Sequence, residues 1–336
     1  MVWNQPLNPQ SRGWKASSLA GRNPLRQRFA RAIAPATIAG CIDHVSGIGN
    51  PSHDLDRPLF GRLYRAGLVP VCRPPAPSNV REQISFWRTY QPPGASMTPL
   101  LQIAIEAHGG LKRWSEVRTV SASASITGAI WAIKGQANYL KDIVVHVDTR
   151  QQRVVTDFPT QDKRLTYEPA RVTLEAPKGR ISLERNVPEA SFAEQSLETP
   201  WDPLHVAYFQ GEALWTYLNS PFLYAQPGFV TDEVSPIEVE GERWRRLKVI
   251  FPDRIKSHTK TQFSCFGPDG LLRRHDYTVD ILGGATGLNY AYDYQEVEGL
   301  QFFTKRRVYA YQGDYVLVPE PLLVNIGISR ITLERN

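Results

Sequence analysis

Asp202 and His205 are the residues whose types and spacing most directly allow acid–base chemistry. Residues three apart on a helix share one face, so the carboxylate could orient the imidazole to act as a general base. Such a pair is the base half of a hydrolytic or isomerising site. A structural explanation competes with it, because an acid that caps a helix and a histidine that packs with a hydrogen bond need no substrate. The sequence favours the structural role and leaves the catalytic pair as the alternative.

A second histidine–acid pair, His275-Asp276, lies in the segment RRHDYTVD, which has the pattern of a strand. Adjacent strand residues point to opposite faces, so these two cannot act together on one substrate. His275 shares a face with Arg273 and Tyr277, and Asp276 shares the other face with Arg274. Either set could bind an anion, although surface cross-strand pairs are the commoner explanation.

Metal and cofactor chemistry have little support in the sequence. His146 and Asp148 share one face of a strand, but only an assumed sheet would bring His275 to them, so we expect no metal site. Nucleophile elbows, phosphate loops and dinucleotide-binding motifs are missing, and we expect no cofactor. The cysteines, Cys41, Cys72 and Cys265, are odd in number and form no CxxC motif, which argues against a disulfide framework. Cys265, between aromatic residues, is expected to be a buried structural thiol.

Aromatic residues give a stronger indication of a binding site. They crowd the segment 201–224 and recur at every second position from Tyr290 to Tyr294. Aromatic walls with a few polar tips suit an apolar ligand cavity, whereas an ordinary core explains any one of these residues alone. The side chains that we expect to line such a cavity are Trp201, Tyr208, Phe209, Trp215, Tyr290, Tyr292, Tyr294 and Tyr309.

One long helix is expected to position several of these residues. The segment Thr199-Pro200-Trp201-Asp202 combines a capping residue, a proline suited to the first helical position and an acid at the third, which predicts a helix start. The following residues, LHVAYFQGEALWTYL, carry a wide apolar stripe, so the helix over Pro200–Leu218 should lie across a sheet. A shorter helix is predicted over 97–108 and ends at Gly109-Gly110.

The rest of the segment after Met97 has the two-residue periodicity of strands. Residues 119–126 and 143–148 alternate apolar and polar side chains, and short turns such as Gly267-Pro268-Asp269-Gly270 separate further runs. Strands joined by short turns predict an antiparallel meander. The further runs cover 153–158, 171–175, 179–185, 229–239, 244–251, 261–266, 271–281, 288–296, 302–311 and 323–333.

Three segments carry a family resemblance: EAHGGLKRWSEVRTV, ETPWDPLHVAYFQGEALWTYLNSPF and FGPDGLLRRHDYTVDILGGA. They resemble an uncharacterised bacterial family that matches this chain end to end from Met97. That family is similar to the LolA/LolB-like lipoprotein carriers, whose fold is an antiparallel sheet curled into an incomplete barrel with helices in the opening. The resemblance implies a mainly β (α+β) half-barrel with a covering helix over 97–336. It implies no reaction.

Residues 1–96 differ from the remainder in charge and composition. They carry 12 Lys and Arg against 4 Asp and Glu, whereas the remainder carries 27 against 29. The later domain is therefore nearly neutral and unsuited to nucleic acid. The first segment also holds 12 of the 26 prolines, and the only methionines are Met1 and Met97. We expect an N-terminal extension, disordered or poorly packed; a transit peptide and a lipoprotein signal ending at Cys41 stay open.

Two functions follow as hypotheses. The first is binding or carriage of a hydrophobic, lipid-like molecule in a half-barrel cavity. The second is a cofactor-free enzyme on an apolar substrate, with His205 as the base and Asp202 as its orienting acid. The expected location is cytoplasmic if the natural start is Met97, and periplasmic or membrane-anchored if the Cys41 signal is real. No apolar run approaches the roughly 18 residues of a membrane span.

Overall fold

The computed structural model describes residues 97–336. The predicted extension over residues 1–96, with the Cys41 signal and Cys72, lies outside the described residues and stays a prediction. The helices of the described part are α3 (Pro99–Ala107), α4 (Leu111–Trp114), α5 (Ala129–Ile133) and α6 (Pro203–Asn219), and the short 3-10 turns are η1 (Pro177–Gly179), η2 (Pro188–Phe192), η3 (Phe222–Ala225) and η4 (Asp280–Leu282).

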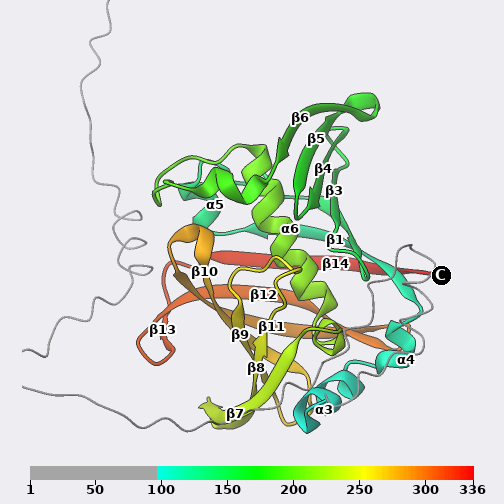
Figure 1. Cartoon of the computed structure of the whole chain (residues 1–336), viewed down its shortest axis with the longest axis vertical. Helices are drawn as coiled ribbons and strands as arrows, with labels where there is room; N and C mark the ends of the chain where they lie inside the picture. The colour runs from blue at the N-terminus through cyan, green and yellow to red at the C-terminus, as the bar shows by residue number, and fades with distance from the viewer. Residues whose placement is uncertain (1–96) are drawn as a thin grey trace, which may run out of the picture. The chain divides into compact units, whose positions relative to one another are not determined.

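A single antiparallel sheet of 14 strands makes up the rest of the described chain (Figure 1). The strands are β1 (Val117–Thr127), β2 (Ile143–Asp148), β3 (Val154–Phe158), β4 (Lys163–Glu168), β5 (Arg171–Ala176), β6 (Arg180–Asn186), β7 (Val230–Val239), β8 (Glu242–Ile250), β9 (Thr261–Phe266), β10 (Leu272–Val279), β11 (Ala285–Val297), β12 (Leu300–Gln312), β13 (Val316–Val318) and β14 (Val324–Arg335).

The strand order is β6-β5-β4-β3-β2-β1-β14-β12-β11-β10-β9-β8-β7, with β13 paired to β12 beside this path. Nearly every neighbour in space is a neighbour in sequence, and the last strand, β14, joins the two halves by pairing with β1 and β12. Strands β6 and β7 stand at the two ends and do not meet, so the curled sheet stays open. The predicted mainly β fold, an antiparallel curled sheet with a covering helix, is confirmed.

Two strands and two short helices were absent from the sequence prediction. Strand β4 has only two apolar residues facing inward, Leu165 and Tyr167, between charged ones, so its alternation is too short to stand out. Strand β13 has three residues and exists through its pairing with β12. Helices α4 and α5 are single turns, and length is what separates a helix from a strand in such short runs.

The start of the long helix differs from the prediction. Asp202, not Thr199, is the N-cap of α6, and Pro203, not Pro200, is the first helical residue. A proline favours an extended conformation in the residue before it, and Asp202 has that conformation, with ψ at 174°. Its carboxylate accepts hydrogen bonds from the backbone N–H groups of Leu204 and His205, both at 2.9 Å.

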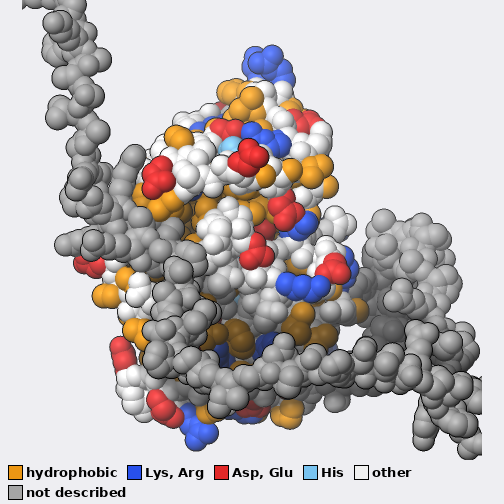
Figure 2. All heavy atoms as spheres, turned by 60° about the vertical axis from the view of Figure 1, so that its left-hand side comes forward, with side chains coloured by type: hydrophobic (Ala, Val, Ile, Leu, Met, Phe, Trp, Pro, Cys, Tyr) orange, Lys and Arg blue, Asp and Glu red, His pale blue; other side chains and the backbone are white. Residues whose placement is uncertain are grey.

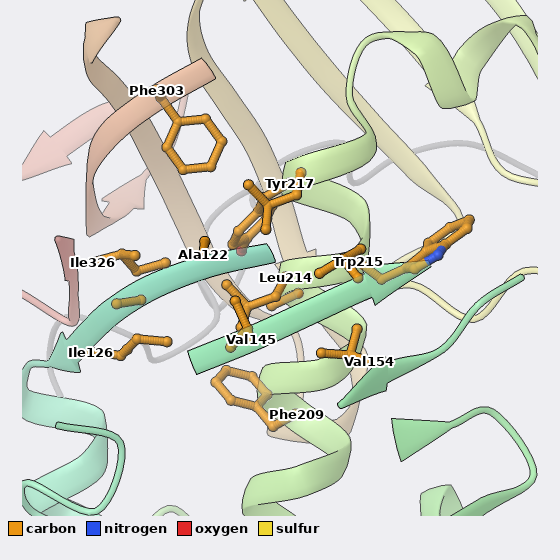
Figure 3. Close-up of a cluster of buried hydrophobic side chains, with 14 of the residues drawn as sticks. Ala122, Ile126, Val145, Val154, Phe209, Leu214, Trp215, Tyr217, Phe303 and Ile326 are labelled. Atoms are coloured by element: carbon orange, nitrogen blue, oxygen red, sulfur yellow. The ribbon is translucent and has the colours of Figure 1, made fainter. Parts of the chain in front are cut away.

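Helix α6 lies inside the curl of the sheet, crossing several strands (Figure 1). All its residues from Leu204 to Asn219 are buried, so the sheet and its connections surround it. In the close-up, Phe209, Leu214 and Tyr217 of α6 lie near Ala122, Val145 and Ile326 of the sheet (Figure 3). The alternation predicted for β1 and β2 is confirmed, since Val120, Ala122 and Val145 face this core. The predicted position of the helix across a sheet is likewise confirmed.

The described surface carries charges of both signs. Acidic and basic side chains are intermixed on the face shown in Figure 2, with hydrophobic side chains between them. This arrangement agrees with the near-neutral charge of residues 97–336. Within residues 97–336, none of the helices has the length and apolar character needed to cross a bilayer.

Candidate ligand cavity

A cavity of about 60 Å³ lies between α6 and the concave face of the sheet. Its wall comes from both halves of the sheet, from α5 and α6, and from η4. Nearly all of that wall is apolar. The lining residues are Ile126, Ile130, Trp131, Phe209, Gln210, Ala213, Leu214, Tyr217, His258, Tyr277, Val279, Leu282, Ala285, Thr286, Gly287, Val308, Leu323, Val324 and Ile326.

Several polar groups of the wall have hydrogen-bond partners inside the protein. The hydroxyl groups of Tyr217 and Tyr277 are 2.6 Å apart, and Gln210 donates to the Thr156 hydroxyl at 3.0 Å. Burial raises the pKa of both tyrosines, so the two phenols stay neutral near neutral pH. The wall therefore presents mainly hydrocarbon and neutral polar groups, of which the Trp131 indole N–H and the Gln210 amide oxygen have no partner within residues 97–336. A wall of this kind suits an apolar ligand.

One titratable pair reaches the cavity. Nδ1 of His258 lies 2.6 Å from Oε1 of Glu212, and both side chains are about 5% exposed or less. Glu212 belongs to α6 and His258 to the β8–β9 connection. The imidazole ring also stacks on Phe209, with ring centroids 5.2 Å apart. This pair has the geometry of an acid that orients a base, and it is distinct from the pair expected from the sequence.

Of the eight aromatic residues expected to line a cavity, the structure places Phe209 in the wall. Trp201 packs behind Phe209, with ring centroids 5.0 Å apart. Tyr208 packs on Tyr167 away from the cavity. Trp215 is buried in the core but does not line the cavity (Figure 3). Its indole N–H donates to the carbonyl oxygens of Asp148 and Gln151.

Tyr290, Tyr292 and Tyr309 form a separate group on the opposite face of the sheet. Tyr290 stacks on Tyr292 with centroids 6.1 Å apart and meets Tyr309 edge-on at 6.2 Å. Tyr294 leaves this face because Asp293 has a positive φ of 52°, which breaks the two-residue alternation. Tyr294 packs on His108 instead, and its hydroxyl donates to the Leu272 carbonyl.

Asp202 and His205 lie outside the cavity wall. Nδ1 of His205 lies 2.8 Å from Asp202 Oδ1 and 3.2 Å from the Asp202 backbone nitrogen, and Nε2 lies 2.9 Å from the Gln195 amide nitrogen. The two residues form a capping box, and Arg185 binds the outer carboxylate oxygen at 2.6 Å. Burial acts to raise the pKa of Asp202, but hydrogen bonds from His205 and Arg185 outweigh it and hold the pKa well below its usual range. With both ring nitrogens occupied, the geometry favours the structural role, and the catalytic pair stays an untested prediction.

The other histidines are also held apart. His275 faces the core and Asp276 faces the opposite side, where Arg274 binds its carboxylate at 2.6 and 2.9 Å. His146 lies on the outer face, with Nδ1 2.8 Å from the Ser121 hydroxyl. The structure does not bring His146, Asp148 and His275 together, and residues 97–336 contain no cluster of three or more potential metal ligands.

Cys265 is buried beside Asp276, as expected of a structural thiol, and burial raises the pKa of its thiol.

Sequence reasoning missed His258 and Tyr277 as cavity residues, and Glu212 as the partner of His258. His258 lies in an irregular connection, SHTK, with no periodicity to assign it a face. Glu212 stands within the apolar stripe of α6, and an acid at such a position is a usable signal, since a buried carboxylate needs a partner. Nothing in the sequence identifies that partner, because Glu212 and His258 are 46 residues apart.

Comparisons with known proteins give structural likenesses only. No protein-family model matches the sequence, and no curated protein matches it. A LolA superfamily protein from Nitrosomonas europaea is 7% identical with a TM-score of 0.41, and the match covers 72% of this chain and 96% of that protein's chain. A DUF1329 family protein from Desulfovibrio piger is 12% identical with a TM-score of 0.42, and the match covers 70% of this chain and 92% of that protein's chain. A domain provisionally described as an outer membrane lipoprotein-sorting protein, from Vibrio parahaemolyticus, is 10% identical with a TM-score of 0.43, covering 70% and 92%.

These likenesses are in line with the LolA/LolB-like resemblance found in the sequence. At such TM-scores and identities they carry no argument about ligand or activity. The functional argument therefore rests on the cavity and the side chains around it.

Proposed function

We propose that the domain over residues 97–336 binds an elongated apolar molecule, such as a lipid chain, in the cavity beneath α6. The observation that carries this proposal is a nearly wholly apolar cavity, walled by both halves of the sheet and by a fully buried helix. Each methylene moved from water into such a wall contributes about 0.8 kcal/mol. Because the cavity's tyrosine hydroxyls already bond each other, a polar ligand would find few free partners there.

The size of the cavity sets a further condition. A cavity of about 150 Å³ holds a benzene molecule, whereas this one measures about 60 Å³. A longer chain must therefore displace part of the wall. Leu282 of η4 lines the cavity and is only half-buried, and Gly283 and Gly284 follow it with positive φ and open space around them. We place the entrance at this segment, Asp280–Gly284.

The test fills the cavity and measures binding. Ala213 lines the cavity from α6, and Ala213→Leu occupies part of the space that a chain would take. We expect calorimetric titration with laurate and with methyl laurate to show binding to the unaltered protein. The variant should bind both at least about tenfold more weakly, which corresponds to the lower end of overpacking costs.

Ala193→Leu is the matched control, because Ala193 is exposed in the segment after η2 and is not one of the residues that line the cavity. It should bind like the unaltered protein. The proposal fails if neither laurate compound binds the unaltered protein, or if Ala213→Leu binds them as tightly as Ala193→Leu.

A cofactor-free enzyme is the second candidate function, and the observation in its favour is that His258, which lines the cavity, is held by the buried carboxylate of Glu212. An imidazole held by a buried carboxylate can take a proton from a bound substrate or from water, and such catalysis contributes roughly 10²–10⁴-fold. This candidate keeps the substrate class and the mechanism type expected from the sequence, but with different residues.

His258→Gln separates the two functions. If the domain is a binding protein, the unaltered protein leaves methyl laurate intact, and His258→Gln still binds it. If the pair is catalytic, the unaltered protein converts the ester and His258→Gln loses that turnover by at least about 100-fold while binding remains. Product analysis by mass spectrometry, alongside calorimetric binding, decides between them.

A further inference from the structure

Arg306 of β12 is a fully buried cation to which residues 97–336 supply no counter-charge. Its side chain is 0% exposed, and its Nε, Nη1 and Nη2 atoms have no hydrogen-bond partner among the residues that the structure describes. The guanidinium lies over the rings of Phe303, 4.0 Å from the centroid, and Tyr217, 4.6 Å from the centroid. These ring contacts satisfy none of its N–H donors. An arginine stays protonated in proteins, so the charge is buried with its donors free.

Two further unpaired polar groups lie on the same face of the sheet. His275 and Asn289 are cross-strand partners on β10 and β11, and both are buried. His275 Nε2 and Asn289 Oδ1 have no partner within residues 97–336. Ala291, two residues after Asn289, is the cross-strand partner of Arg306. The three polar side chains therefore occupy adjacent strands around one point of the concave face.

Tyr217 separates this cluster from the cavity. Its ring lines the cavity, and it also lies within 4.6 Å of the Arg306 guanidinium and 6.0 Å of the His275 ring. Two neighbours of Arg306 line the cavity as well: Val308, two residues along β12, and Ile326, its cross-strand partner on β14. The apolar cavity thus ends at an unpaired cation that one tyrosine side chain covers.

We propose that Arg306, with His275, binds the carboxylate of a ligand whose hydrocarbon chain occupies the cavity. Nε2 of His275 donates to the carboxylate as the N–H of the neutral ring, whereas the unpaired Oδ1 of Asn289 is an acceptor and takes no part in holding it. The assignment rests on the function proposed above and names its substrate class, a long-chain carboxylic acid. One guanidinium supplies parallel N–H donors that match the two oxygens of a carboxylate, and a single negative charge balances a single positive one. Tyr217 must turn aside for the head group to reach Arg306, while the chain extends along the apolar wall.

The unaltered protein provides the first test, by comparing laurate with methyl laurate near neutral pH. The two share the same chain, but the ester carries no charge. We expect laurate to bind at least about tenfold more tightly, since hydrogen bonds to charged groups contribute about 1.5–3 kcal/mol. Equal affinity for the two compounds overturns the carboxylate assignment and leaves the binding function standing, and internal water would then satisfy the cluster. Absence of binding by either compound defeats the binding function itself.

Arg306→Met is the second test, with Arg307→Met as the matched control. Arg307 is the next residue of β12, exposed on the opposite face near Tyr292. Arg306→Met should lose the preference for laurate and bind the ester unchanged, whereas Arg307→Met should keep the preference. Retention of the preference by a folded Arg306→Met protein overturns the proposal. If Arg306→Met does not fold, the laurate and ester comparison on the unaltered protein still decides.

Discussion

Gly211→Ala should lower the free energy of unfolding by about 3 kcal/mol, the upper end of typical overpacking costs. Gly211 is in the middle of α6, where alanine would normally stabilise a helix by about 1 kcal/mol. A β-carbon at this position would lie 2.3 Å from Cγ, 2.4 Å from Cβ and 2.7 Å from Cδ1 of Tyr167. These atoms are close to the β4 backbone and cannot move aside as the end of a flexible side chain could. The helix must shift away from β4 instead, so the usual sign of the substitution reverses.

Urea unfolding followed by far-ultraviolet circular dichroism measures this effect. Gly327→Ala is the control, because Gly327 of β14 has an ordinary φ and no atom within 4 Å of the position that an added β-carbon would take. It should change stability by no more than about 1 kcal/mol. Because α6 forms one wall of the cavity, Gly211→Ala should also weaken laurate binding. If Gly211→Ala is as stable as the unaltered protein, α6 does not approach Tyr167 as closely as described.

Mild acid should destabilise the domain through its buried histidines. Burial lowers the pKa of His108 to about 4, although a hydrogen bond to the Ala104 carbonyl opposes the shift. Burial also lowers the pKa of His275, and the charge of Arg306 acts in the same direction. In the unfolded chain a histidine titrates near 6.5. The unfolded chain therefore binds more protons than the folded chain as the pH falls below about 6.5, and stability is lost until the folded pKa is reached.

His108 alone should contribute about 2 kcal/mol to the stability lost between about pH 7 and about pH 5. His108→Gln cannot titrate, so its stability difference between these two pH values should be smaller by that amount. Leu101→Ala serves as the control, since Leu101 is equally buried in α3, the helix that His108 caps, and its loss destabilises the core without removing a titrating group. Urea unfolding at both pH values tests this, and an unchanged pH dependence in His108→Gln would contradict it.

Much of the fold could be predicted from the sequence because the relevant signals are local. The alternation in residues 119–126 and 143–148 reflects one buried and one exposed face, and short turns such as 267–270 allow only antiparallel pairing. The apolar residues of α6 predicted that it would lie on a sheet. The predicted start of α6 was three residues too early, because Thr199-Pro200 and Asp202-Pro203 both have the pattern of a helix start. The second is used, since the Asp202 carboxylate accepts hydrogen bonds from the backbone N–H groups of Leu204 and His205.

The candidate site depended on contacts that local patterns do not contain. Alternation predicts that Tyr290 and Tyr292 share a face, but the curl of the sheet decides that this face is the outer one. Asp202 and His205 are close in sequence and serve the helix end, whereas Glu212 and His258 meet only because the β8–β9 connection folds over α6.

Arg306 shows most clearly which features follow from a local sequence pattern and which depend on tertiary contacts. In sequence it is one of two adjacent arginines, Arg306 and Arg307, on a strand with ordinary alternation, and nothing distinguishes them. The sequence by itself determined that they point to opposite faces, because strand geometry is local. Only the tertiary structure decided that one of them is enclosed between α6 and the sheet, with no counter-charge from the described part of the chain. Burial depends on what the distant parts of the chain place over each face.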